Sequence, residues 1–95
     1  MKHCISAKFG DMVADKKETL AQVKALFAAA APVEGVTGIV IHENCVARDN
    51  RYDLMIVVEM ARDALGAWDT SEIHHQWKAQ FGGMLASKAI FDYED

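Results

Sequence analysis

Two adjacent histidines, His74 and His75, stand beside Trp77 in a segment with helical periodicity, and His3 lies near the start of the chain. Imidazole suits general acid or base catalysis near neutral pH, and it is also a common zinc ligand. Adjacent residues on a helix point about 100° apart, whereas helical ligand pairs need a spacing of three or four. We therefore expect no metal site at this histidine pair.

The two histidines fall on different faces of the predicted helix. Ile73, Trp77 and Phe81 recur at helical spacing and form an apolar stripe. His74 lies about 50° from the middle of this stripe, while His75 lies about 150° away. We expect His74 to face inward or along the rim, His75 to face water, and Trp77 and Phe81 to lie in the core.

His3 lies on the same face of a predicted strand as Ile5 and Phe9. That face is the more apolar one, so we expect it to lie under the helices. Where His3 and His74 converge there, a neutral imidazole in a partly buried pocket can act as a general base. The alternative for both residues is a rim histidine that is hydrogen-bonded to the backbone. His42, at the end of another predicted strand, is expected on the surface.

The length and charge of the chain exclude several classes of protein. The 95 residues are enough for one domain, covering 1–95, and 52% of them are hydrophobic. The formal net charge is -4 and the basic residues form no continuous stripe, which argues against a nucleic-acid partner. No apolar run approaches the roughly 20 residues that span a bilayer, and the first residues lack a signal-peptide pattern. We therefore expect a cytoplasmic protein without a membrane partner.

Cys4 and Cys45 are isolated thiols. They have neither a C-x-x-C spacing nor an extracellular context, so a disulfide or a thiolate zinc site is not expected. We expect both to be reduced packing residues, and we expect no cofactor.

The secondary structure follows from periodicity and from turn residues. Residues 2–9 alternate as a strand does, and Asp15 with Glu18 forms a capping box for a helix that runs to about residue 31, before Pro32. The β-branched segments 36–44 and 52–60 predict a hairpin, and 61–68 opens a second helical region. Asp69 and Glu72 offer a capping box for the helix with the histidines, and 87–94 predicts a last strand. This order predicts an α+β, ferredoxin-like β-α-β-β-α-β fold, with helices on one face of a four-stranded antiparallel sheet.

The second and third strands are apolar on both faces, although a sheet with one wet face should alternate apolar with polar residues. Helices can cover one face, so a second subunit is expected to cover the other. The opposed sets are Leu54, Ile56, Val58 and Met60 against Met55 and Val57, and Ile39 and Ile41 against Val36 and Val40.

Four pieces of the sequence, in this order and spacing, resemble the stress-responsive dimeric α/β-barrel family, known as the Dabb domain. They are the opening Met1-Lys2-His3, the strand 51–59, the helix with His74, and the ending Phe91-Asp92-Tyr93-Glu94. The resemblance implies a homodimer whose two four-stranded sheets close into one barrel with the helices outside.

One plant branch of this family contains a polyketide cyclase that works without a cofactor. Its first-strand histidine matches His3 and its last-helix histidine matches His74, while a pocket tyrosine falls on Trp68 and a further histidine on Leu54. The family's His-Pro-x-His entry to the last helix reads Ser71-Glu72-Ile73-His74 here. Because several members of the cyclase site are missing, we do not expect that particular reaction.

The sequence thus predicts a homodimer of unassigned biochemical activity with a small-molecule pocket between sheet and helices. The alternatives are a cofactor-independent enzyme, cyclase-, decarboxylase- or monooxygenase-like, that acts on a small aromatic or polyketide-like substrate, and a binding module without chemistry. His74 would be the catalytic base and His3 would orient the substrate. The expected pocket residues are Tyr52, Trp68, Leu54 and Phe27.

Overall fold

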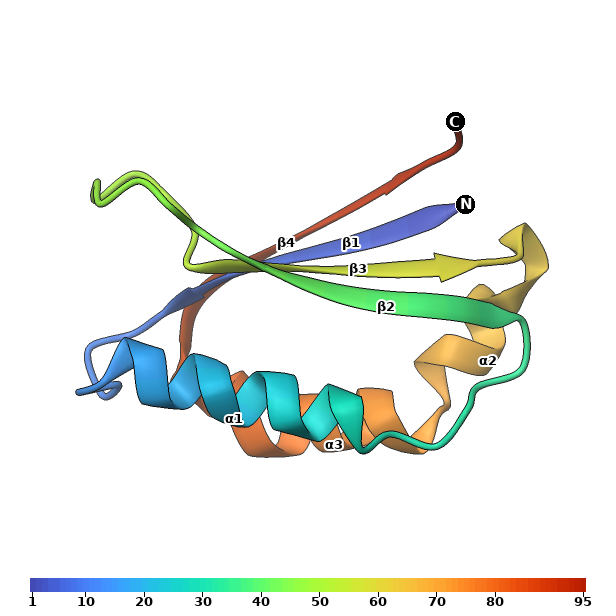
Figure 1. The fold of residues 1–95 in the computed structure, drawn as a ribbon, viewed down its shortest axis with the longest axis horizontal. Coiled ribbons are helices and arrows are strands. Elements are labelled where there is room, and N and C mark those ends of the chain that lie inside the picture. The colour runs from blue at the N-terminus through green and yellow to red at the C-terminus, as the bar shows by residue number, and fades with distance from the viewer.

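A four-stranded antiparallel sheet with every helix on one side of it forms the molecule, seen in a computed structural model that describes all of residues 1–95 (Figure 1). The strand order across the sheet is β2-β3-β1-β4. The strands are β1 (Lys2–Phe9), β2 (Val36–Glu43), β3 (Leu54–Met60) and β4 (Leu85–Tyr93). The ferredoxin-like order predicted from the sequence is confirmed, and the far face of the sheet carries no helix.

Helix α1 (Lys16–Ala28) begins where the capping box predicts. The Asp15 side chain accepts a hydrogen bond of 3.1 Å from the backbone N–H of Glu18. The helix ends three residues before the expected position near residue 31. The reason lies in the backbone, because the N–H of Ala30 bonds to the carbonyl of Phe27 in a tighter turn, before Pro32 is reached.

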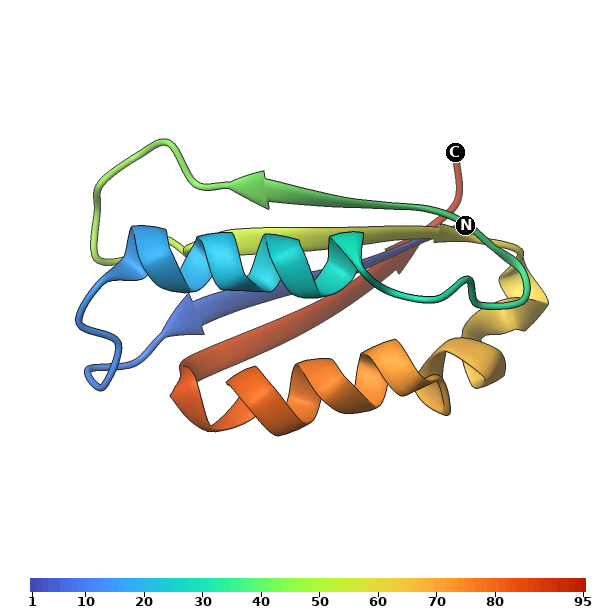
Figure 2. The same cartoon turned by 60° about the horizontal axis from the view of Figure 1, so that its bottom comes forward.

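Helix α2 (Leu65–Asp69) follows β3 at one end of the sheet, and α3 (Glu72–Phe81) then runs beneath the sheet beside α1 (Figure 2). The cap of α3 differs from the prediction, because Ser71 and not Asp69 is its N-cap. Ser71 Oγ accepts from the backbone N–H of His74 at 3.2 Å, while Asp69 is the last residue of α2. The predicted cap was therefore wrong, because Asp69 still belongs to α2 and the chain leaves the helical conformation only after it.

The first residues of β2 correct the predicted strand faces. The pairing of β2 with β3 is irregular between Val36 and Gly38, so that Val36 lies opposite Met60. Val36 therefore packs against the core on the helix side instead of sharing a face with Val40. Just before it, Gly35 has a φ of 82°, and a Cβ there would lie 2.6 Å from the Cβ of Ala64.

The core lies between the sheet and the helices and includes the predicted apolar stripe of α3. Trp77 contacts Phe27 of α1 at a ring distance of 5.9 Å and Phe81 at 5.6 Å. No helix in the structure combines the length and the apolar character that crossing a membrane requires. The largest fully buried side chains are Trp68, Trp77, Ile5, Ile56, Val23 and Val58.

Candidate functional site

His3 is held by a carboxylate that lies directly across the sheet. The antiparallel pairing of β1 with β4 sets His3 opposite Asp92, so the two side chains share the helix-facing side. His3 Nδ1 lies 2.5 Å from Asp92 Oδ1, and His3 is only 6% exposed. Since a carboxylate accepts hydrogen bonds, Nδ1 carries the proton and donates it, which fixes the tautomer of the neutral ring.

Trp68, on α2, lies against both histidines. Its ring is edge-on to the ring of His3 with centroids 6.3 Å apart, and it is tilted against the ring of His74 at 5.6 Å. We call His3, Trp68 and His74 the histidine–tryptophan cluster. Trp68 is completely buried, and its Nε1 has no hydrogen-bond partner. A buried N–H without a partner costs about 1–3 kcal/mol, so this nitrogen is an exception that needs an explanation.

His74 is the partly exposed member of this cluster, near the start of α3. Its Nδ1 lies 2.9 Å from the backbone carbonyl oxygen of Asp69. A carbonyl can only accept, so Nδ1 donates and the lone pair of Nε2 remains free. His75 is exposed, and the predicted split between an inward and a solvated histidine is confirmed.

A surface hollow of about 510 Å³ adjoins His74 on the polar side of α3. His74, His75 and Lys78 line it together with the segment from Asp69 to Glu72, and His3 does not. His3 and His74 therefore each contact the indole of Trp68, and they do not face each other across this hollow. No group of three or more His, Cys, Asp or Glu side chains is arranged to hold a metal ion.

The other expected pocket residues lie apart from the cluster. Leu54 pairs with Ala7, whereas His3 pairs with Val58. Four residues of strand separate the two positions, about 13 Å. Phe27 packs on Trp77, and Tyr52, 40% exposed, stands in the loop before β3. Of the four expected pocket residues, only Trp68 contacts the histidines.

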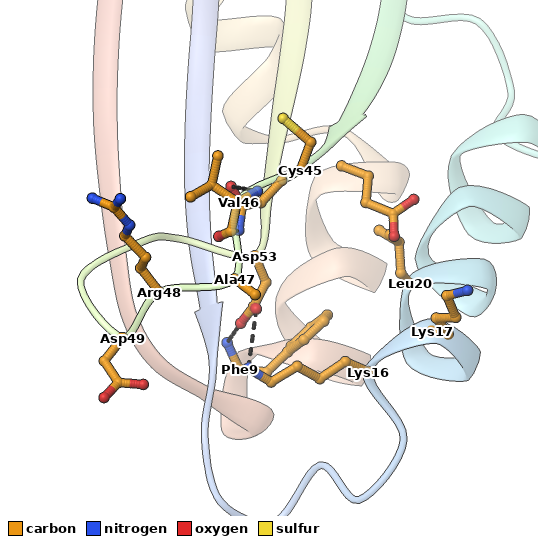
Figure 3. A pocket seen from close by; sticks show the side chains of 12 residues that line it. Phe9, Lys16, Lys17, Leu20, Cys45, Val46, Ala47, Arg48, Asp49 and Asp53 are labelled. Atoms are coloured by element: carbon orange, nitrogen blue, oxygen red, sulfur yellow. Dashed lines mark hydrogen bonds and ion pairs between the residues drawn. The ribbon is translucent and has the colours of Figure 1, made fainter.

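A second hollow, of about 480 Å³, lies between the β2–β3 loop and the first turn of α1 (Figure 3). Asp53 lies at its centre and accepts hydrogen bonds from the backbone N–H of Phe9 at 2.8 Å and from Lys16 Nζ at 3.1 Å. Lys16 points toward Asp53, while Arg48 extends from the far side of the loop. The basic and acidic side chains that line this second hollow are equal in number, so the hollow has no net charge to attract an ion.

The open face of the sheet carries a continuous apolar row. The strand register sets Val40 beside Val57, Val57 beside Cys4, and Cys4 beside Phe91, so each strand contributes one side chain. Val40 is 53% exposed and Phe91 is 67% exposed. Single exposed apolar residues are ordinary, whereas a contiguous exposed apolar patch indicates an interaction surface.

Two groups of the site were not predicted from the sequence: the side chain of Asp92 and the backbone carbonyl of Asp69. Asp92 alternates with Ile90 on the helix-facing side of β4, but its side chain is 39% exposed, so its position in the sequence does not call for a partner. Naming Asp92 as the partner of His3 requires the register of β1 with β4. The contact of His74 with a backbone carbonyl leaves no trace in the residue types.

No family model matches this sequence, and no curated protein matches it significantly. Solved structures match almost the whole chain. A dimeric ferredoxin-like protein of unknown function from Thermobifida fusca has a TM-score of 0.77 at 18% identity, covering 99% of this chain and 89% of its own. A Dabb family protein with a ferredoxin-like fold from Mesorhizobium loti has a TM-score of 0.70 at 13% identity, covering 99% and 94%. The chain has the fold of the Dabb family.

The likeness to the Dabb family, predicted from the sequence, is therefore confirmed at the level of the fold. A hydroxynitrile lyase from Passiflora edulis shares this fold as well, with a TM-score of 0.71 at 7% identity, covering 97% of this chain and 89% of its own. Sequence identities this low support a shared fold with these proteins but not a shared activity.

Proposed function

We propose that the chain forms a homodimer through the open face of its sheet, so that two four-stranded sheets close into one barrel with the helices outside. The apolar row of Val40, Val57, Cys4 and Phe91 carries the proposal, because no helix covers it. Burying such a row against a second copy removes apolar surface from water. The dimeric solved structures from Thermobifida fusca and Bacteroides fragilis support this assembly.

Sedimentation at micromolar concentration tests the dimer. We expect a species of about 21 kDa, twice the 10.5 kDa of one chain. Val57→Lys puts a charge in the middle of the row and should yield the monomer, because an unpaired buried charge is costly. Gln80→Lys, an exposed position on α3, is the matched control and should leave the dimer intact. A wild-type protein that sediments as a monomer would refute the proposal.

We further propose that the histidine–tryptophan cluster binds a small molecule, with His74 as the base beside the hollow and His3 orienting the ligand through the indole of Trp68, which contacts both imidazoles. The free lone pair of His74 Nε2, beside a surface hollow, favours this use, since a base must reach the proton it takes. Asp92 would hold the ring of His3 in one orientation. The lyase from Passiflora edulis is an enzyme of the same fold, which supports chemistry at such a site.

Mass spectrometry of small molecules that co-purify with the protein tests this second proposal. The wild type should retain a molecule that Gln80→Ala also retains, because Gln80 is exposed and does not line the hollow. In His74→Ala, an enzyme should retain a different molecule, its unconverted substrate. The same molecule in all three proteins would indicate binding without catalysis. A wild type that retains nothing would count against the site.

The resemblance to the Dabb domain adds a role in a stress response to the proposal. Messenger RNA levels after heat or osmotic shock of the source cells test it, and an unchanged level under both would contradict it.

A further inference from the structure

We propose that Trp68 selects the ligand of the histidine–tryptophan cluster by donating its Nε1–H to a neutral carbonyl oxygen on a small aromatic molecule. The inference rests on the ligand site proposed above and specifies its chemistry. Trp68 Nε1 is the one buried side-chain nitrogen or oxygen in the chain without a hydrogen-bond partner. Buried polar groups in native proteins are otherwise nearly always paired, so a donor left over beside two histidines points to an acceptor that arrives with a ligand.

The neighbouring side chains do not supply that acceptor. His3 uses Nδ1 for Asp92, and His74 uses Nδ1 for the carbonyl of Asp69. Both imidazoles meet the indole as rings, edge-on or tilted, and no hydrogen bond joins either of them to Trp68 Nε1. The carbonyl of Trp68 itself already accepts from Ser71 Oγ at 2.7 Å. The indole N–H is therefore the free donor of the cluster.

The surroundings of the indole define the class of ligand. The Asp92 carboxylate stands behind His3, so an anionic acceptor would be repelled and would lose its hydration without a paired cation. A neutral carbonyl oxygen accepts without that cost. Aromatic rings pair favourably at centroid distances of about 4.5–7 Å, which the three rings of the cluster already adopt, so a flat ring suits the same place.

Access is from the side of His74. His3 is 6% exposed and Trp68 is fully buried, whereas His74 is partly exposed and lines the hollow of about 510 Å³. The one side-chain hydrogen bond of His74 goes to the Asp69 carbonyl. Because Trp68 does not line the hollow itself, a ligand would reach its indole only after the imidazole of His74 turns aside.

A matched pair of ligands tests the proposal: acetophenone, and α-methylstyrene, in which a methylene group replaces the carbonyl oxygen. Each is titrated into nitrogen-15-labelled wild-type protein while the two indole N–H signals are followed by NMR. The Trp68 signal is assigned through its proximity to the rings of His3 and His74. We expect acetophenone to bind about fivefold more tightly than α-methylstyrene, which is the ratio for one buried hydrogen bond. We also expect acetophenone to move the Trp68 indole N–H signal downfield. Trp68→Phe keeps a ring without the donor and should bind both ligands equally.

The outcomes separate this inference from the proposal on which it rests. Equal binding of the two ligands, an unmoved Trp68 signal, or a preference retained by Trp68→Phe would overturn the role of Trp68 and leave the ligand site standing. If neither ligand perturbs the protein, both the inference and the site fall. The wild-type titration decides these cases even if Trp68→Phe does not fold.

Discussion

The two cysteines lie in opposite surroundings, although the sequence suggested the same packing role for both. Cys4 is buried in the apolar row of the sheet, and burial raises the pKa of its thiol. Cys45 is exposed in the β2–β3 loop. Thiolates and not thiols react with alkylating reagents, and a raised pKa lowers the thiolate fraction at any given pH.

We therefore expect iodoacetamide at neutral pH to label the folded protein once, at Cys45. Raising the pH should bring labelling of Cys4 later than that of Cys45. At neutral pH, Cys45→Ser should take up label only after denaturant is added, which is read by mass spectrometry of the intact chain. Rapid labelling of Cys4 in the native protein would contradict its burial.

Trp77 is one of the two largest fully buried side chains in the core beneath the sheet. It is 1% exposed and packs on Phe27 and Phe81. Trp77→Ala should lower the free energy of unfolding by about 3–5 kcal/mol, because it leaves a large cavity among side chains that cannot collapse into it. Urea denaturation measures this loss. Gln80→Ala, on the exposed side of the same helix, should change the stability by less than about 0.5 kcal/mol.

The start of α3 is an element whose cap was predicted wrongly from the sequence, because Ser71 and not Asp69 is the N-cap. Ser71 Oγ accepts from the backbone of His74 and donates to the carbonyl of Trp68. Ser71→Ala should therefore cost about 1 kcal/mol in the free energy of unfolding. Asp69→Ala should cost little, because only the backbone carbonyl of Asp69 is used. The reverse ranking in urea denaturation would restore Asp69 as the cap.

In β2, the predicted faces were right for three residues and wrong for Val36. Alternation along the sequence correctly assigned Ile39, Ile41 and Val40, since the period of two holds wherever the ladder is regular. It failed for Val36, because a single irregularity in the pairing with β3 turns the preceding residues to the other face. Periodicity cannot reveal a bulge that depends on the partner strand.

For the assembled molecule, the uncovered face predicts that stability depends on protein concentration. If two copies associate through the apolar row, association favours the folded state by mass action, and the Tm should rise as the protein concentration rises. Calorimetry over a hundredfold range of concentration tests this expectation. Val57→Lys should give a lower Tm that does not change with concentration, while Gln80→Lys should behave as the wild type does. A constant Tm for the wild type would argue against a dimer.

Residue order by itself determined the ferredoxin-like arrangement of strands and helices, the two apolar faces of the sheet, and the position of His74 at the rim of the core, away from the solvent-facing side of His75. These features depend on local periodicity and on capping residues, which act over a few positions of the chain. The tertiary structure alone decided that Asp92 holds His3 and that Trp68 stands between His3 and His74. Such contacts join strands and helices that are far apart in sequence, and only strand register and helix packing bring them within hydrogen-bonding or ring-contact distance.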